Sequence, residues 1–346
     1  MYNFLINREL NERESEILQR IVHLYILNGN PIGSRFLSKT LENEMKLSPA
    51  TLRNIMADLE DMEFITHPHT SAGRIPTDKG YRFYVNNLEK KEKINKKEIT
   101  VIQKNLLNTN QEDTFQNASK LLGALSKYLS IIELPSFKKS IVRNIELILL
   151  RSNKILIVVE LESDFVKTIT LEMNFDIDSK YLNNVNQVLN EKISGKTLEY
   201  IREHFAKIFS EIDFSETPLI RLFTDSVDKI FQDDNINNRI VISGTTNLLY
   251  HPEFEDLKKV RTIIELIENE EIIVHVLEKC EENDNINVLI GKELEIDMLD
   301  DYSLIRSSFK IGKSKGSIGI IGPKRMDYSK MISLVSIFSE ILSKVK

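Results

Sequence analysis

The sequence holds a single cysteine, Cys280, and one thiol cannot form an internal disulfide. Residues 1–10 lack the long apolar run of a secretory signal peptide. The most apolar stretch, residues 145–161, is interrupted by Arg151 and Lys154. It therefore falls short of the roughly 20 unbroken apolar residues that a membrane helix requires. We expect a cytoplasmic protein in which residues 145–161 form two buried strands joined by a turn.

An excess of positive charge is also absent, since the net charge is −6. Nucleic-acid binding depends on Lys and Arg that neutralise phosphates, but their distribution matters more than their sum. Within residues 1–88 four glutamates gather at the first expected helix: Glu9, Glu12, Glu14 and Glu16. The later segments carry the basic residues Arg35, Lys39, Lys46, Arg53, Arg74, Lys79 and Arg82. A basic face is therefore compatible with the acidic total.

The first 88 residues carry start and stop signals for three helices. Asn11 followed by Glu14 has the N-x-x-E form of a helix start, and the segment 28–31, Asn-Gly-Asn-Pro, stops that helix. Ser34 is expected to cap a second helix, and the pair Ser48-Pro49 opens a third. The short connection between the second and third helices is typical of a helix-turn-helix.

The segment after the third helix predicts a hairpin and a further helix. Residues 64–66 and 75–76 are expected to form two short strands around the polar turn 67–74. Thr77 is expected to cap a last helix, which leads into the charged linker expected at 89–105. A hairpin after the third helix is a wing, so residues 1–88 are predicted to be a winged helix-turn-helix that binds double-stranded DNA.

The outward face of the third helix holds the candidate base-reading residues. Leu52, Ile55, Met56 and Leu59 repeat at spacings of three and four and face the core. Arg pairs with two acceptors on guanine and Asn with a donor and an acceptor on adenine, each pair contributing about 1–3 kcal/mol of discrimination. The alternative is a solvated face whose Arg53 and Asn54 pair with Asp58 or Glu60. The wing favours DNA, and the candidate DNA-binding residues are Arg35, Ser48, Thr51, Arg53, Asn54, His69, Thr70, Ser71 and Arg74.

The wing residue Arg74 has two interpretations of its own. We expect it to contact phosphate or the minor groove, and the alternative is a turn residue that pairs with Asp78. His67 and His69 stand two residues apart, but no cysteine or acidic cluster lies beside them, so no metal site is expected.

The sequence gives little support for nucleotide binding or catalysis. Gly312-Lys313-Ser314 copies the end of a phosphate-binding loop, but the first glycine of that loop would fall on Ser307, so a hairpin turn is expected instead. The histidines and Cys280 form no recognisable catalytic set. No enzyme activity, cofactor or catalytic residue is predicted.

The remaining chain predicts an α+β body. Its expected elements are a helix over 113–132, strands at 141–150, 154–162 and 165–173, helices between 178 and 232, a helix near 255–269, strands near 271–279, 286–291, 303–311 and 316–321, and a closing helix from 327. Strands on both sides of a helical block indicate a discontinuous domain with an insertion. The wide apolar helix faces between 178 and 232 require partners, either one another or a second subunit.

Three segments resemble the heat-inducible transcription repressor family HrcA. They are Pro31–Ser34, Ser48–Asn54 and the run from Pro68 to Val85, PHTSAGRIPTDKGYRFYV. Further segments, Gly244–Leu249 and Gly319–Tyr328, resemble the body of that family. The pair Met62-Glu63 departs from the Leu-Gly expected at the end of the third helix, which puts the local cap in doubt.

The resemblance implies a multidomain α+β architecture with a GAF-like domain at 106–175 and 241–346 and an inserted, mainly helical dimerising domain at 176–240. It implies a homodimer that represses chaperone operons by binding an inverted-repeat operator, with the chaperonin GroEL maintaining its activity. Two rivals remain. One is a regulator whose GAF-like domain senses a metabolite, and the other is a winged helix that binds proteins.

Overall fold

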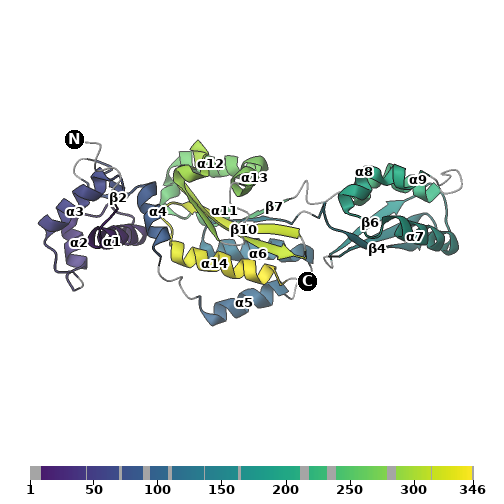
Figure 1. The fold of residues 1–346 in the computed structure, drawn as a ribbon, viewed down its shortest axis with the longest axis horizontal. Coiled ribbons are helices and arrows are strands. Elements are labelled where there is room, and N and C mark those ends of the chain that lie inside the picture. Colours follow the sequence, from purple (N-terminus) through teal and green to yellow (C-terminus); the bar gives the residue numbers. More distant parts are fainter. Residues whose placement is uncertain are drawn as a thin grey trace.

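The computed structural model describes residues 9–43, 45–69, 72–88, 94–107, 111–135, 137–162, 165–210, 218–231, 239–278, 286–312 and 314–344. Three units follow one another along the long axis of the molecule (Figure 1). We call them the winged unit, which contains the first four helices; the central unit, which contains a five-stranded sheet; and the distal unit, which contains a three-stranded sheet.

The winged unit has the predicted order of elements: α1 (Glu12–Asn28), α2 (Ser34–Thr40), α3 (Pro49–Asp61), β1 (Ile65–Thr66), β2 (Ile75–Pro76) and α4 (Asp78–Asn86). The helix start at Asn11 is confirmed, because its Oδ1 accepts the Glu14 N–H at 2.9 Å and the Asn11 N–H donates to Glu14 Oε2 at 3.0 Å. The predicted cap at Ser34 is wrong by one residue. Gly33 is the N-cap, without a side-chain hydrogen bond, and Ser34 is the first helical residue.

The central unit holds an antiparallel sheet in the order β7-β3-β10-β9-β8. Its strands are β3 (Leu129–Glu133), β7 (Ile240–Ser243), β8 (Asn287–Ile290), β9 (Tyr302–Ile311) and β10 (Ser314–Pro323). Its helices are α5 (Lys96–Leu107), α6 (Gln111–Ser126), α11 (Thr245–Leu248), α12 (Leu257–Glu268), α13 (Glu270–Glu278) and α14 (Tyr328–Leu342), with short 3-10 turns η2 (Pro252–Glu255), η3 (Gly291–Leu294) and η4 (Asp297–Leu299). Figure 1 shows α12 and α13 on one side of the sheet and α14, α6 and α5 on the other.

The distal unit has its own core. It consists of β4 (Val142–Arg151), β5 (Lys154–Leu161), β6 (Val166–Glu172), α7 (Ser179–Ile193), α8 (Leu198–Ile208), α9 (Pro218–Asp225) and α10 (Val227–Phe231). The buried apolar side chains from Phe137 to Phe231 form one cluster, separate from the cluster of the other two units. The domain limits expected from the sequence differ from this grouping. The expected GAF-like domain at 106–175 included β4, β5 and β6, and the expected inserted domain began only at residue 176. Alternation along a strand shows which face is buried but not which core it joins.

Three predicted elements are wrong. The helix expected over 113–132 ends at Ser126, and Leu129–Glu133 is instead β3, because Lys127 has a positive φ of 65° that breaks the helix. The strand expected near 271–279 is α13, whose β-branched residues resemble a strand but bury Ile273, Val276 and Leu277 at helical spacing. The linker expected at 89–105 becomes α5 from Lys96, anchored by buried Ile102 and Leu106, and residues 89–93 lie outside the described part.

Candidate nucleic-acid interface

The helix α3 presents its N-terminus and one polar face to solvent. Ser48 caps it, since its Oγ accepts the Thr51 N–H at 3.1 Å, and Pro49 is the first helical residue. Leu52 and Leu59 are buried on the opposite face. Arg53 and Asn54 are exposed, and neither side chain forms a hydrogen bond or ion pair within the described residues. We call α3 the reading helix, because these are the side chains predicted to contact bases.

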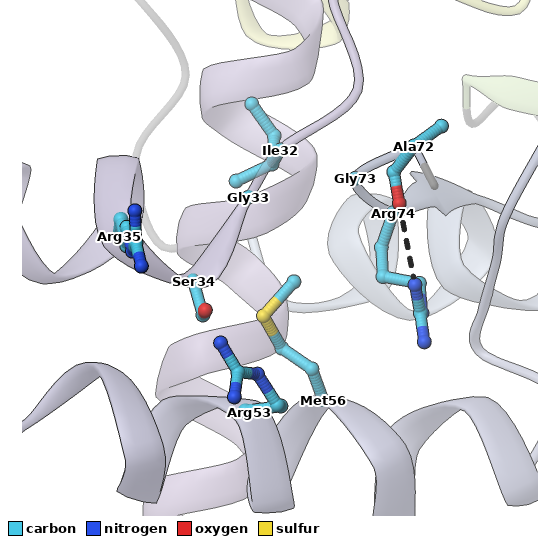
Figure 2. A pocket seen from close by; sticks show the side chains of 9 residues that line it. All are labelled: Ile32, Gly33, Ser34, Arg35, Arg53, Met56, Ala72, Gly73 and Arg74. Carbon is cyan, nitrogen blue, oxygen red and sulfur yellow. Dashed lines mark hydrogen bonds between the residues drawn. The ribbon is translucent and has the colours of Figure 1, made fainter. Parts of the chain in front are cut away.

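A hollow of about 360 Å³ lies between the reading helix, the start of α2 and the return arm of the hairpin. Figure 2 shows the side chains that line it, among them Arg35, Arg53 and Arg74. Arg35 is exposed and, like Arg53, has no acidic partner among the residues that the structure describes. Two open guanidinium groups thus border one concave surface, which suits an anionic backbone.

Exposed cations extend this surface along α2. Lys39 and Lys46 are exposed, and together with Arg35, Ser48 and Glu42 they border a second hollow of about 440 Å³. Four of the seven predicted basic side chains, Arg35, Lys39, Lys46 and Arg53, therefore lie on the α2–α3 side.

The other three cations are engaged inside the protein. Lys79 Nζ donates to the Met62 carbonyl at 2.9 Å and lies 4.4 Å from the centre of the Phe64 ring. Arg82 pairs with Glu293 of the central unit. Arg74 Nε donates to Glu60 Oε2 at 2.7 Å, and its Nη2 lies 2.6 Å from the same oxygen. The predicted basic face is therefore narrower than the sequence indicates.

Glu60 is a site residue that was expected only as an alternative partner of Arg53 or Asn54. Its second oxygen contacts Nδ1 of His67, so one carboxylate on the reading helix holds both ends of the hairpin turn. The alternative pairing of Arg74 with Asp78 is wrong, because Asp78 pairs with Lys324. Charged residues 14 positions apart in the sequence carry no local signal for this contact.

Two glycines make the hairpin possible. We call residues 65–76 the wing, in which Ile65 pairs with Pro76 and Thr66 with Ile75. The arm is fastened to the segment before α2 by Ile32 and Arg74, whose backbone groups exchange hydrogen bonds of 2.8 and 2.9 Å. A Cβ at Gly73 would lie 2.6 Å from the carbonyl carbon of Ile32, and one at Gly80 would lie 2.2 Å from the Phe64 oxygen. Any larger residue at either position would therefore force the backbone apart.

The tip of the wing holds the remaining predicted residues. His69 is exposed. Thr70 and Ser71 lie outside the described residues. No group of three or more His, Cys, Asp or Glu side chains suited to a metal ion occurs among the described residues, and none of the described helices is long and apolar enough to cross a membrane.

Known proteins resemble the chain over nearly its whole length. The family model described as HrcA protein C terminal domain matches residues 112–332. A heat-inducible transcription repressor HrcA of Chlorobium phaeobacteroides (strain BS1) is 34% identical over 347 residues, which cover 97% of this chain and 98% of the relative. One of Carboxydothermus hydrogenoformans is 35% identical over 341 residues, with the same coverage.

One solved structure supports the fold. It is titled as the crystal structure of a hypothetical protein, covers 98% of this chain and 100% of its own, and gives a TM-score of 0.67 at 23% identity. Its likeness concerns the mixed α+β architecture. From the match to the family model and the two full-length relatives, the chain belongs to the HrcA family of heat-inducible transcription repressors.

Proposed function

We propose that the chain represses transcription by binding an inverted-repeat operator in double-stranded DNA as a homodimer. The observation that carries this proposal is the open polar face of the reading helix, where Arg53 and Asn54 are exposed and unpaired among the described residues beside an open Arg35. A helix that enters the major groove N-terminus first brings such side chains to base edges.

The site residues divide into three roles. Arg53 and Asn54 contact bases, with Thr51 near them although its Oγ1 lies 3.0 Å from Ser48 Oγ in the cap. Arg35 and Ser48 contact phosphates. The wing residues His69, Thr70, Ser71 and Arg74 contact phosphate or the minor groove.

Dimerisation is assigned to the distal unit. Its sheet is covered by helices on one face only, and the uncovered face exposes Ile148, Leu150 and Val166. Exposed apolar surface of this kind marks interaction sites. A two-fold pair of subunits matches a two-fold operator. Deletion of residues 137–231 should therefore give monomers, and a deletion variant that stays dimeric in sedimentation would contradict this assignment.

We further propose that the chaperonin GroEL keeps the repressor active in the cytoplasm. The family resemblance implies this partner. Apolar side chains exposed on the central unit support it, above all Tyr250 and Leu257, which are 87% and 82% exposed.

Metabolite sensing by a GAF-like central unit is the second candidate function. It is favoured by Nε and Nη1 of Arg306 and Nε of Arg239, which are buried without a hydrogen-bond partner among the described residues. Spare guanidinium donors suit a small carboxylate or phosphate. Such a ligand at a hundred times its Kd should stabilise the chain by about 2.7 kcal/mol, and the Arg306→Met variant should lose that gain. Identical melting curves with and without every tested ligand would contradict metabolite sensing and favour a repressor without a small-molecule effector.

The deciding experiment is fluorescence anisotropy with an operator duplex and a scrambled duplex over a salt series, with and without GroEL. Specific repression predicts a preference of about 10³ or more for the operator and a steep loss of affinity as salt rises. Equal weak binding to both duplexes, in the presence of GroEL as well, would refute the proposal.

A further inference from the structure

The winged unit and the central unit meet at a charged contact built from two of the segments that resemble the family. One segment supplies Asp78 and Arg82 on α4, and the other supplies Lys324 and Arg325 after β10. Figure 1 shows α4 between the rest of the winged unit and the central unit. We call the contact of Asp78, Arg82, Glu293, Lys324 and Arg325 the docking interface.

We propose that the docking interface fixes the orientation of the reading helix relative to the rest of the subunit, and thereby sets the separation of the two reading helices in a dimer. This inference rests on the proposed DNA-binding function. It assigns Asp78 and Arg82 a positioning role, away from DNA.

Asp78 fits a site on the central unit that is formed by Gly291, Lys292 and Lys324, which we call the seat. Its Oδ1 accepts from Lys324 Nζ at 2.7 Å and its Oδ2 accepts from the Lys292 backbone N–H at 3.1 Å. Gly291 has a positive φ of 54°, and a Cβ there would lie 2.3 Å from Asp78 Oδ2. The seat therefore depends on glycine both for its backbone conformation and for the space that the carboxylate fills.

Arg82 is held in one orientation by a bidentate ion pair with Glu293. Its Nε donates to Glu293 Oε1 at 2.8 Å, while Nη2 contacts Glu293 Oε2 and donates to the Val288 carbonyl at 2.5 Å. Glu293 is fixed in turn, because its Oε2 accepts the Ile290 N–H at 2.9 Å. A bidentate pair restricts rotation as well as distance, which a single point charge does not.

Arg325 binds the end of the first helix. Its Nη1 donates to the Ile26 carbonyl at 3.0 Å, where α1 has carbonyls without helical partners, and its Nε donates to Glu253 Oε1 at 2.5 Å. Beside these charges the rings of Tyr81 and Tyr328 lie 6.1 Å apart, and both side chains are buried. Three charged contacts around an apolar centre define a fixed orientation and not a hinge.

The interface leaves the DNA-binding face open. The docked elements are α4 and the end of α1, whereas Arg53 and Asn54 on the reading helix remain exposed. The docked state is thus compatible with operator binding, and its loss should lower affinity for a site of fixed spacing.

The test is a charge swap between Arg82 and Glu293 in the full chain. Spin labels on cysteines at exposed Ala57 and Arg261, in a Cys280→Ser background diluted with unlabelled chain, report the distance between the two units. We expect one narrow distance distribution for the parent, a broad one for Arg82→Glu, and a narrow one again when Glu293→Arg is added. Arg82→Gln is the milder variant, and Arg13→Glu, on an exposed part of α1, is the control.

Operator affinity is measured on the same charge variants without the cysteine substitutions and labels, because Ala57 lies on the exposed face of the reading helix. Arg82→Glu should bind the operator at least tenfold more weakly, and the swapped double variant should recover most of that loss, because it restores an ion pair between the two units. Unchanged distances in Arg82→Glu, or a broad distribution with unchanged operator affinity, would overturn the inference. Tighter operator binding by Arg82→Glu would overturn it too, since docking would then be inhibitory. A parent that fails to bind the operator while its distances respond as expected would refute the proposed function and leave the docking role standing.

Discussion

Arg74 Nε lies 2.7 Å from Glu60 Oε2, so a carboxylate on the reading helix holds the guanidinium that borders the Arg35–Arg53 hollow. This ion pair, one of two contacts that Glu60 makes to the wing, is partly shielded from solvent, with side-chain exposures of 27% for Arg74 and 22% for Glu60. Arg74 is placed where a phosphate in the hollow would compete with Glu60 for it.

Removing the charge of Glu60 tests this competition. Glu60→Gln keeps a hydrogen-bond acceptor but removes the charge that competes with phosphate for Arg74, so binding to any duplex should tighten. Arg74→Ala should weaken binding to all sequences alike and flatten the slope of log affinity against log salt by about 0.9. Anisotropy over a salt series measures both, and a slope that stays at the parent value in Arg74→Ala would show that Arg74 remains on Glu60 in the complex.

Arg53→Ala should act on specificity. Because Arg53 is exposed on the reading helix, its loss should reduce discrimination at one base pair by about 1–3 kcal/mol and leave the others unchanged. A panel of operator duplexes with single substitutions measures this. Arg13→Ala, an exposed arginine on α1, is the matched control, and a uniform loss over the whole panel with Arg53→Ala would contradict base reading.

Glu63 occupies a conformation suited to glycine. Its φ is 62°, directly after the C-cap Met62, where the resemblance expects glycine. A left-handed conformation costs an L-residue about 1–2 kcal/mol, partly offset by the greater freedom of unfolded glycine, so Glu63→Gly should stabilise the chain by about 0.5–1 kcal/mol. Asp61→Gly, inside the last turn of α3, should destabilise it instead. Urea unfolding compares the two variants, and a lower free energy of unfolding in both would contradict strain at Glu63.

Stability should fall at alkaline pH because of buried phenols. Burial raises the pKa of Tyr128 to about 12 from 10.0, and burial also raises the pKa values of Tyr81, Tyr302 and Tyr328. Above pH 10 the unfolded chain loses these protons while the folded chain keeps them, so stability is retained below pH 10 and declines toward about pH 12. The slope is about 1.4 kcal/mol per pH unit for each such group.

The Tyr128→Phe variant should lose stability less steeply between pH 10 and 12, because one of the ionising phenols that cause the decline is removed. Urea unfolding at several pH values between 8 and 12 provides the slopes, with the 87% exposed Tyr250→Phe as the control. A decline equal to that of the parent in Tyr128→Phe would mean that this phenol ionises freely in the folded state.

Local signals predicted the winged unit well. The caps at Asn11, Ser48 and Thr77 lie within three residues of the N–H groups that they accept, so sequence spacing alone indicates them. The strand β3 and the helix α13 were missed, because β-branched and apolar residues suit both structures until the tertiary packing selects one.

Contacts between segments far apart in the chain could not be predicted from the sequence. Asp78 and Lys324 are 246 positions apart, and nothing in either segment indicates the other. The same holds for Glu60 and Arg74, because Glu60 was expected only as an alternative partner of Arg53 or Asn54, and Arg74 as a contact to DNA or a partner of Asp78. As a result, the predicted basic face grouped the exposed Arg35, Lys39, Lys46 and Arg53 with Lys79 and Arg82, which are engaged within the protein.

The docking of Asp78 on Gly291 bears on how this repressor can be re-engineered. A chimera that joins residues 9–88 to a foreign dimerising body would carry every predicted base-reading side chain but would leave Asp78, Arg82 and the Ile26 carbonyl without partners. Such a chimera needs the matching surface around Gly291, Glu293 and Arg325 grafted onto the recipient. The portable unit is the winged unit together with its seat.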